Sequence, residues 1–525
     1  MNIPLLLLSL ASSFVICVQS QLTLNLKADN SYEIFQSNVS KLQSAPVPYA
    51  IRSNGVVLSS ADGSLKADGA ATPITGSDPF LGPFTGYSIS WNAGIFITDF
   101  KVFNSGDAIV FAQRFPAGLL GMSGGDKDGL STGFPVFFAP QNTLKDSATG
   151  FVTWKGGMCS GKSGAWTASS TKGNVGGSDS GPVVLFDTKN IALVLSPLSN
   201  FMTAHLAFAN IVGDSFGSGL GGMVTQVPAG WSYETLLVSS ESGITAATLR
   251  MGAVLLARGG KSPTAPDADV AVSTLGYWTD NGAYYYYNSE NNTIVGNMQQ
   301  TISDVITYWA SLSLPLKHLM YDSWWYWKEC PPGSKSNTWL ACKGAVELWE
   351  PRDDVFPDGF NFQPPNLPLV LHNRWFSANN NTYINDLGFA DSFIVESAVD
   401  FALPIKSDVF LYLMGRAKKW GMTVYEQDWL ITVWESMSVT KANVTAASSW
   451  LAAMADAASE LGLTIQYCMP LPRHMLESTK HQAVTNARAS GDYHPGATNW
   501  DLGTSSLFYW AIGIAPSKDD WWLVD

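Results

Sequence analysis

The sequence predicts a secreted chain of two parts, a β-sandwich followed by a (β/α)8-type TIM barrel that looks incomplete at its C-terminus. Three observations lead to this fold class. The first twenty residues have the composition of a signal peptide. Residues 21–265 contain short alternating runs broken by Gly, Ser, Asp and Asn. Residues 266–525 alternate strand-like and helical stretches, which indicates βα units and a parallel sheet.

Length and composition set the limits for function. The chain has 525 residues, enough for two or three domains with sizeable cores. Its net charge of −13 argues against a nucleic-acid partner. Only 14% of residues are charged while 12% are aromatic, including 20 Trp. Aromatic rings stack on the apolar faces of sugars, so this balance suits a protein that handles neutral, hydroxyl-rich ligands, although core packing explains most of these Trp equally well.

The N-terminal segment predicts export. An apolar run over residues 3–18 is interrupted by Ser9, Ser12 and Ser13, and small residues flank a cut after Ser20. This run is too short and too interrupted for a membrane span, and no later stretch is long and apolar enough. We therefore expect a secreted or lumenal protein without a membrane span.

The cysteines and sequons fit that compartment. Cys17 leaves with the signal peptide, Cys330 and Cys342 are placed to form a disulfide, and Cys159 and Cys468 are either thiols or a second pair. No Cys/His cluster suggests zinc, so neither a metal nor a cofactor is expected. Four glycosylation sequons begin at Asn38, Asn291, Asn380 and Asn443.

Within the first part, alternating runs at 87–91, 95–100 and 108–115 predict strands, and no sustained helical period occurs before roughly 245–258. Two motifs here are declined. Residues 176–182 faintly resemble a serine-protease nucleophile loop, but every histidine follows Ser180. The glycines between 217 and 222 lack a strand before them and a helix after them, so a phosphate loop is not expected.

The second part predicts a barrel more than a doubly wound sheet. Strands are expected near 274–279, 317–323, 368–374, 422–428, 463–468, 484–489 and 520–524, with helices such as 297–312, 411–420 and 445–461 between them. The seventh strand would end close to Asp525, so the eighth unit is missing. Either the chain is a fragment or another segment fills the gap.

Carboxylates follow the predicted strands, and in a barrel the carboxyl ends of the strands meet at one face. Asp428 ends the strand near 422–428, and Asp492 follows Gly491 just beyond the strand near 484–489. Two carboxyl groups across an acetal are the minimal machinery of glycoside cleavage, one ionised to attack and one protonated to assist departure. Asp428 suits the nucleophile, Asp492 suits the acid/base, and Arg488 is placed to orient a sugar hydroxyl.

These segments resemble those of the α-galactosidase and raffinose synthase clan of retaining glycoside hydrolases (clan D). Residues 488–495, Arg-Ala-Ser-Gly-Asp-Tyr-His-Pro, look like the clan's Arg-x-Ser/Thr-Gly/Asp-Asp segment, which implies that Asp492 is the acid/base and Arg488 contacts the sugar. The run 425–429 resembles the strand that carries the nucleophile, implying Asp428. Asp322 matches an acid that holds sugar hydroxyls. An N-terminal β-supersandwich before the barrel is also typical of clan members.

The sequence departs from this pattern in three places. Glu426 replaces the customary Lys, and Tyr321 replaces the first acid of the second strand, so the preference for galactose stays open. The usual C-terminal β domain is absent. Further substrate-binding residues are expected at the strand ends, namely Trp278, Asp280, Trp324, Arg374, Glu426 and Trp429.

Several alternatives remain at this point. Glu426 could be the nucleophile with Asp428 in support, and Asp322 could bind only the loop backbone. His372, His494 and Arg374 are as easily structural as ligand-binding. The expected function is a secreted retaining glycoside hydrolase cleaving α-linked sugars by double displacement. The alternatives are a transglycosylase of the raffinose-synthase type and a catalytically degenerate carbohydrate-binding protein. The partner in each case is a carbohydrate, and the sequence is silent on oligomeric state.

Overall fold

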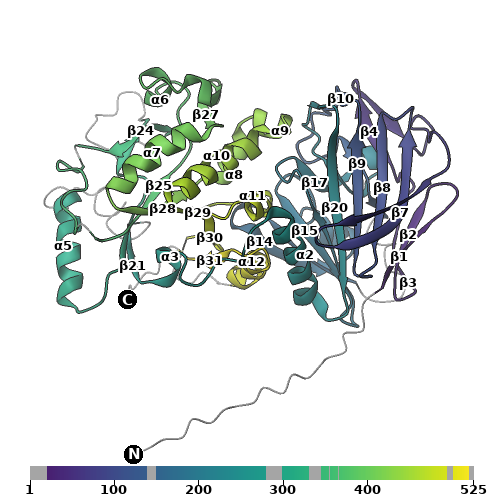
Figure 1. The fold of residues 1–525 in the computed structure, drawn as a ribbon, viewed down its shortest axis with the longest axis horizontal. Coiled ribbons are helices and arrows are strands. Elements are labelled where there is room, and N and C mark those ends of the chain that lie inside the picture. Colours follow the sequence, from purple (N-terminus) through teal and green to yellow (C-terminus); the bar gives the residue numbers. More distant parts are fainter. Residues whose placement is uncertain are drawn as a thin grey trace, which may run out of the picture.

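A β region occupies one end of the molecule and an α/β region the other (Figure 1). The structure is a computed structural model that describes residues 21–138, 149–279, 298–329, 344–353, 355–364, 366–492 and 500–518. The predicted signal peptide, residues 1–20, lies outside these residues. In the part of the chain that is described, no helix combines the length and apolarity that a membrane crossing requires.

The β region is built on a nine-stranded antiparallel sheet in the order β14-β13-β15-β16-β20-β9-β8-β7-β6. Its strands are β6 (Thr72–Asp78), β7 (Gly82–Trp91), β8 (Phe96–Phe103), β9 (Ala108–Phe115), β13 (Gly150–Lys155), β14 (Ser160–Ala165), β15 (Ser180–Phe186), β16 (Ala192–Pro197) and β20 (Trp231–Ser240). The predicted runs at 87–91, 95–100 and 108–115 fall on β7, β8 and β9 and are confirmed as strands.

Smaller antiparallel sheets cover one face of this large sheet. They comprise β1 (Leu22–Leu26), β2 (Tyr32–Gln36) and β3 (Val39–Gln43); β4 (Ala50–Ser53), β5 (Val56–Ser59) and β11 (Thr132–Gly133); β12 (Val136–Phe137), β17 (Ala204–Ala209) and β18 (Ser215–Leu220); and β10 (Leu119–Leu120) with β19 (Gln226–Val227). A short helix, α1 (Ala168–Thr171), follows β14.

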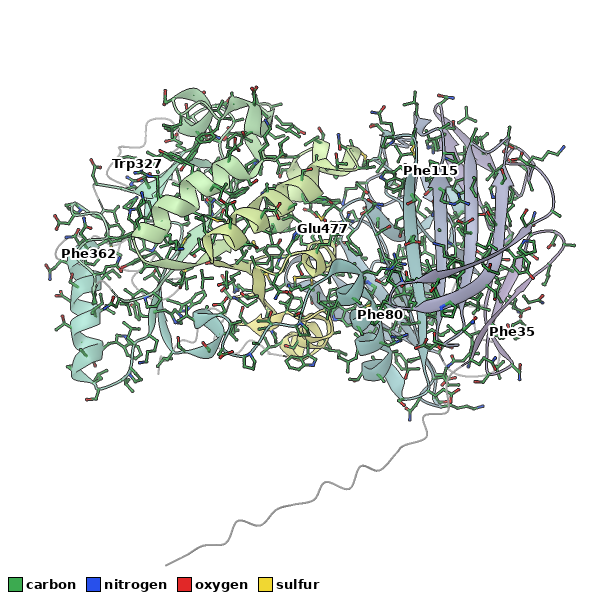
Figure 2. All side chains as sticks on the ribbon, in the orientation of Figure 1. Phe35, Phe80, Phe115, Trp327, Phe362 and Glu477 are labelled. Atoms are coloured by element: carbon green, nitrogen blue, oxygen red, sulfur yellow. The ribbon has the colours of Figure 1, made fainter. Side chains whose placement is uncertain are left out.

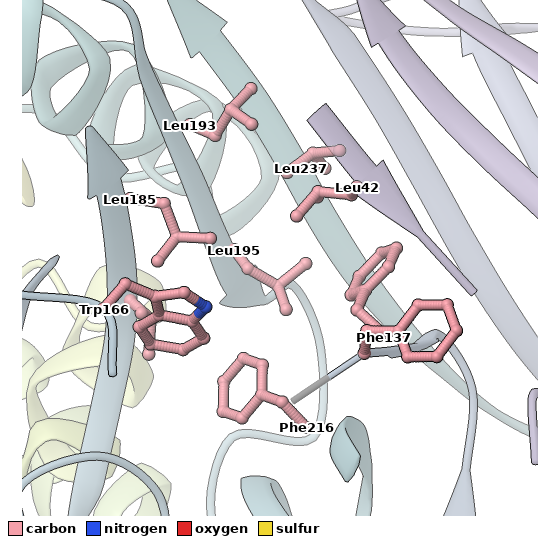
Figure 3. A pocket seen from close by; sticks show the side chains of 10 residues that line it. Leu42, Phe137, Trp166, Leu185, Leu193, Leu195, Phe216 and Leu237 are labelled. Atoms are coloured by element: carbon pink, nitrogen blue, oxygen red, sulfur yellow. The ribbon is translucent and has the colours of Figure 1, made fainter. Parts of the chain in front are cut away.

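An apolar core lies between these layers. Figure 3 shows part of it: Leu193 and Leu195 of β16 and Leu237 of β20 face Leu42 of β3 and Phe216 of β18 across a small apolar pocket. Strands that alternate in polarity have one apolar face, and here the apolar faces of two layers meet and leave water.

Helix α2 (Gly243–Gly259) connects the two regions, and it confirms the predicted helical period near 245–258. One face of α2 packs on β16 and β20, and another crosses helix α12 (Trp500–Ala511). A Cβ atom at Gly252 would overlap the carbonyl group of Ala511, so this close crossing requires glycine. The connector therefore belongs to both regions.

The α/β region contains a seven-stranded parallel sheet in the order β21-β22-β25-β28-β29-β30-β31. The strands are β21 (Gly276–Trp278), β22 (His318–Tyr321), β25 (Leu369–Asn373), β28 (Met422–Gln427), β29 (Thr464–Tyr467), β30 (Val484–Arg488) and β31 (Ala515–Ser517). The main helices are α3 (Val270–Ser273), α5 (Met298–Ser311), α7 (Ser407–Lys419), α10 (Ala446–Leu461), α11 (Pro472–Glu477) and α12. This serial order of parallel strands is that of a TIM-like half-barrel.

Shorter elements are inserted between these units. They are the hairpins β23 (Tyr326–Lys328) with β24 (Val346–Pro351) and β26 (Phe393–Glu396) with β27 (Phe401–Pro404), and the helices α6 (Thr382–Asn385), α8 (Leu430–Ser436) and α9 (Val439–Ala442).

A seventh parallel strand is present in the described residues, upstream of the position predicted for it. Strand β31 occupies Ala515–Ser517 and pairs in parallel with β30, whereas the predicted strand at 520–524 lies outside those residues. Helix α12 ends at Ala511, and Gly513, with φ 71°, turns the chain straight back into the sheet. A three-residue strand containing Pro516 lacks the apolar alternation on which the prediction depended.

The two regions share a core and buried hydrogen bonds. Side chains fill the space between them around α11, where Figure 2 marks Glu477. Arg473 of α11 donates to the carbonyl oxygens of Ser178 and Met202, and its guanidinium carbon lies 4.0 Å from the ring centroid of Trp434. The indole of Trp154 donates to the Thr504 carbonyl at 2.8 Å. The half-barrel is thus fixed against the β region.

Candidate active site

Side chains alternate along parallel strands, so residues in register form layers inside the half-barrel. The deepest layer here is apolar. Val370 of β25 is in register with Met320 of β22 on one side and with Val424 of β28 on the other, and Trp278 packs on these three residues. Two residues after Val424, Glu426 forms a polar layer. Two residues after Glu426, Asp428 stands at the carboxyl end of β28.

Asp428 is held from several sides. Its Oδ2 atom lies 3.1 Å from Nε2 of His372, and Oδ1 accepts a hydrogen bond from the backbone N–H of Trp429 at 2.6 Å. Its own N–H donates to the Asn373 carbonyl at 2.9 Å, continuing the ladder from β25. Trp429 has φ 60°, an uncommon value that ends the strand abruptly and begins helix α8. The carboxylate therefore has a fixed place at the rim of the sheet.

His372 is oriented by a second partner. The Tyr326 hydroxyl lies 3.0 Å from Nδ1 of His372, and the two rings are stacked. Burial raises the pKa of Tyr326 well above its ordinary value, so the phenol keeps its proton and donates it to Nδ1. The proton of the neutral imidazole then belongs on Nε2, where it points at Asp428. Tyr326, His372 and Asp428 form a directed chain of hydrogen bonds.

These contacts decide the charge of Asp428. Burial alone would raise the pKa of Asp428, but hydrogen bonds from His372, Cys468 and the Trp429 N–H oppose that effect. The net result lowers the pKa of Asp428 below its ordinary value. The carboxylate is consequently ionised at neutral pH, the form that a nucleophile requires.

A second chain of contacts leads from Asp428 to Asp492. The thiol of Cys468, at the end of β29, hydrogen bonds to Asp428, and Nη1 of Arg488 lies 3.5 Å from the Cys468 sulfur. Arg488 ends β30, and its Nη2 donates to Oδ1 of Asp492 at 2.6 Å. The Tyr509 hydroxyl fixes the Arg488 carbonyl at 2.8 Å. The structure thus brings Asp428, Arg488 and Asp492 together across three adjacent strands.

Glu426 occupies the polar layer beneath Asp428. Glu426 is 1% exposed, and its Oε1 atom accepts a hydrogen bond from Gln466 of β29 at 3.4 Å. Asp428 is 9% exposed and stands one layer nearer the rim. This depth favours Asp428 over Glu426 as the attacking group.

Asp322 and Trp324 have different surroundings. Asp322 follows β22, its Oδ1 accepts from the Ser323 N–H, and its own N–H donates to Oγ1 of Thr279 at 3.2 Å. This agrees with the alternative in which Asp322 binds the loop backbone. Trp324 is 1% exposed and packs on Tyr321 and Phe356, so it offers no open ring for a sugar.

The structure also corrects the role expected of Trp278. Its indole N–H donates to Nε2 of His318 at 3.0 Å, and its ring closes the deepest apolar layer, two layers below Asp428. Trp278 ends the short strand β21, but its register with Met320 places this indole in the layer of Val424, at the floor of the half-barrel. Asp280, the other residue predicted there, lies outside the described residues.

An aromatic cluster stands beside Asp428. The guanidinium of Arg374 lies over the rings of both Trp375 and Trp429, 4.7 and 5.0 Å from their centroids, and the two rings meet edge to face at 5.4 Å. Both rings are partly exposed, and Nη1 of Arg374 donates to the Gly344 carbonyl at 3.3 Å. Cation–π contacts of this kind hold the rings in place. Arg374 therefore serves here to position the aromatic rings, and Trp429 stays a candidate for sugar contact.

The predictions for the cysteines and for His494 have different outcomes. Cys159 and Cys468 are both buried thiols rather than a disulfide, and the Cys159 thiol donates to the Pro470 carbonyl at 3.5 Å. The option of a second disulfide between them is wrong. The predicted disulfide between Cys330 and Cys342 falls outside the described residues, as does His494. Across the described segments, no group of three or more His, Cys, Asp and Glu side chains is placed to hold a metal ion.

Sequence reasoning missed the roles of Tyr326, His372 and Cys468. The sequence places His372 near the end of the predicted strand at 368–374, but only the pairing of β25 with β28 shows that it lies beside Asp428. Cys468 also ends a predicted strand, but it was considered only as a disulfide partner. The useful signal for both was register between neighbouring strands.

Comparison with known proteins gives the fold a context. No family model matches the chain, and no curated protein matches it. Among solved structures, the α-N-acetylgalactosaminidase NagBb from Bifidobacterium bifidum is similar, with 11% identity, a TM-score of 0.56, and coverage of 94% of this chain and 82% of that one. The α-galactosidase from Lactobacillus brevis has 10% identity, a TM-score of 0.52, and coverage of 95% and 75%. The chain therefore shares the multidomain fold of α-galactosidase-like glycosidases.

Proposed function

We propose that this chain is a secreted, retaining glycoside hydrolase that cleaves α-linked sugars, with Asp428 as nucleophile and Asp492 as acid/base. The observation that carries the proposal is the position of Asp428 at the carboxyl end of a central parallel strand, where it contacts His372 and is linked to Asp492 through Cys468 and Arg488. The similar solved glycosidases support it through the fold. In this proposal residues 266–525 form the catalytic barrel, and residues 21–265 form a β-supersandwich that braces it.

The first step forms a glycosyl-enzyme. An oxygen of Asp428 attacks the anomeric carbon, and the bond between that carbon and the leaving oxygen breaks. Asp492 transfers its proton to the leaving oxygen, which departs as an alcohol. His372 and Cys468 hold Asp428 ionised before the attack, so the nucleophile needs no separate base.

The second step returns the enzyme. Asp492, now a carboxylate, removes a proton from water while the water oxygen attacks the anomeric carbon, and the ester bond to Asp428 breaks. Arg488 donates a hydrogen bond to Oδ1 of Asp492 and so holds this carboxyl group in place for the step. Two inversions give net retention of the α configuration.

A panel of aryl α-glycosides tests the proposal. Wild type is expected to hydrolyse at least one of the α-galactoside, α-N-acetylgalactosaminide and α-glucoside, and Asp428→Asn is expected to lose essentially all of that turnover. Asp386→Asn, an exposed carboxylate at the end of α6, is the matched control and is expected to be unchanged. Undiminished activity of Asp428→Asn contradicts the assignment, and sugar binding without turnover by wild type indicates a degenerate site. Product analysis with an added acceptor sugar separates hydrolysis from transfer.

A further inference from the structure

An open groove of about 690 Å³ lies between the β region and the segment that precedes α10. This volume is within the range of roughly 300–1,000 Å³ typical of ligand pockets. One side is formed by β10 and β19 with their flanking turns, and the other by residues 443–445. Asp428, Arg488 and Asp492 do not line this groove.

The lining of the groove is apolar with a polar border. Leu120, which is 60% exposed, and the partly exposed Val444 supply apolar surface, and the buried residues Leu119 and Val227 lie beneath it. Ser53, Asn54, Thr225 and Gln226 lie along the border. Sugars have apolar ring faces and hydroxyl edges, so a saccharide fits such a surface better than a fully apolar ligand does.

The groove also spans a junction. The N–H and the hydroxyl of Thr225 both donate to the carbonyl of Ala442, at 3.1 and 3.3 Å, which ties the β19 side to the end of α9. A ligand in the groove therefore contacts both the β region and the α/β region at once.

One residue that lines the groove belongs to a glycosylation sequon. Asn443 is exposed and begins the sequon Asn443-Val444-Thr445. Its Oδ1 atom accepts from the N–H and the hydroxyl of Thr445, both at 2.9 Å, and from the N–H of Ala446 at 3.1 Å. The carboxamide oxygen is thus committed to the start of α10, which places the nitrogen Nδ2 on the opposite branch of the side chain.

We propose that Asn443 is N-glycosylated and that the first sugars of this glycan occupy the groove, packing on Leu120 and Val444. The inference rests on the expected secretion of the chain, not on its catalytic activity. The donor is a lipid-linked oligosaccharyl diphosphate. Nδ2 of Asn443 forms a bond to the anomeric carbon, the bond from that carbon to the diphosphate oxygen breaks, and Nδ2 gives up one proton.

The glycan has a structural consequence. Its ring faces remove apolar surface of the groove from water, in particular that of Leu120, which is otherwise exposed. Because the groove spans the two regions, a glycan bound in it resists their separation. The other described sequons, at Asn38 and Asn380, are exposed but do not line this groove.

The test compares full-length protein secreted from eukaryotic cells. Asn443→Asp removes the attachment site but keeps the oxygen that accepts from Thr445 and Ala446, and Asn38→Asp is the matched control at another sequon. We expect glycopeptide mapping to find a glycan on Asn443, and we expect Tm to fall by about 2 °C in Asn443→Asp while Asn38→Asp melts like wild type. Leu120→Ser is expected to lower Tm in glycosylated protein but not in Asn443→Asp.

Two results overturn the proposal. One is recovery of Asn443 unmodified, whether or not the other sequons carry glycans. The other is identical melting of wild type and Asn443→Asp, together with an effect of Leu120→Ser that does not depend on the glycan. Activity on aryl glycosides is expected to be the same in all these variants, so a failure here is distinct from a failure of the proposed function.

Discussion

Removing the imidazole of His372 should weaken catalysis and shift its pH dependence together. Nε2 of His372 donates to Oδ2 of Asp428 at 3.1 Å, and this is the largest of the contacts that oppose burial. A hydrogen bond to a charged group contributes about 1.5–3 kcal/mol. If the bond contributes that free energy to keeping Asp428 ionised and in position for attack, His372→Leu lowers kcat/KM by roughly 10- to 150-fold.

The direction of the pH effect follows from the same contacts. In the folded protein the pKa of Asp428 is lowered, so the ionised, active form persists below the ordinary pKa of an aspartate. In His372→Leu the effect of burial is less opposed, and the pKa of Asp428 rises. The acidic limb of the kcat/KM profile should therefore move to higher pH.

The assay is a profile of kcat/KM against pH with an activated aryl α-glycoside, alongside near-UV circular dichroism to show that the variant is folded. Tyr326→Phe is the matched control, because it removes the donor to Nδ1 but leaves the Nε2–H to Asp428. It should shift the acidic limb in the same direction by less. A folded His372→Leu variant with an unshifted acidic limb would refute the role of His372.

Further predictions concern three other buried groups. Cys468→Ala should shift the acidic limb of kcat/KM upward as His372→Leu does, because the thiol also lowers the pKa of Asp428; an unshifted profile counts against this contact. Burial lowers the pKa of Lys261 to about 7 in the folded protein. Between pH 7 and roughly pH 10 the unfolded chain therefore binds more protons than the folded chain, and Tm should rise with pH. Lys261→Met should flatten this rise, and an unchanged slope of Tm against pH would contradict the role of Lys261. Arg473→Met should lower the free energy of unfolding by about 2–5 kcal/mol, because it leaves buried carbonyl groups without donors. Arg416→Met, at an exposed ion pair, should change the free energy of unfolding by less than about 1 kcal/mol. Equal effects of the two substitutions in urea titrations would contradict this difference.

The fold class was accessible from the sequence wherever a local period was strong. The alternation at 108–115 gives β9 with the same bounds, and the helical spacing at 445–461 differs from α10 by one residue. Asp428 could be placed because the helix, the glycine and the strand before it define where β28 ends. These signals are local, and burial of an apolar face reinforces each of them.

The remaining site depended on information that local patterns do not hold. Register between β25 and β28 aligns His372 with Glu426, one layer below Asp428, and a shift of one residue would point the imidazole to the other face. Trp278 and Trp324 both follow strand-like runs, yet one ring closes the floor of the half-barrel and the other is buried against Phe356. Depth within the barrel follows from strand length and packing, which the composition of a strand end does not encode.

The most direct test of the two-carboxylate mechanism is azide rescue with the anomer of the product determined by NMR. In Asp428→Gly, azide can take the place of the missing nucleophile and attack the substrate once, so an aryl α-glycoside should give the β-glycosyl azide. In Asp492→Gly, azide should instead intercept the glycosyl-enzyme on Asp428, and two inversions should give the α-glycosyl azide. The account predicts this pair of opposite anomers. The same anomer from both variants, or turnover by Asp428→Gly without azide at the wild-type rate, would contradict it.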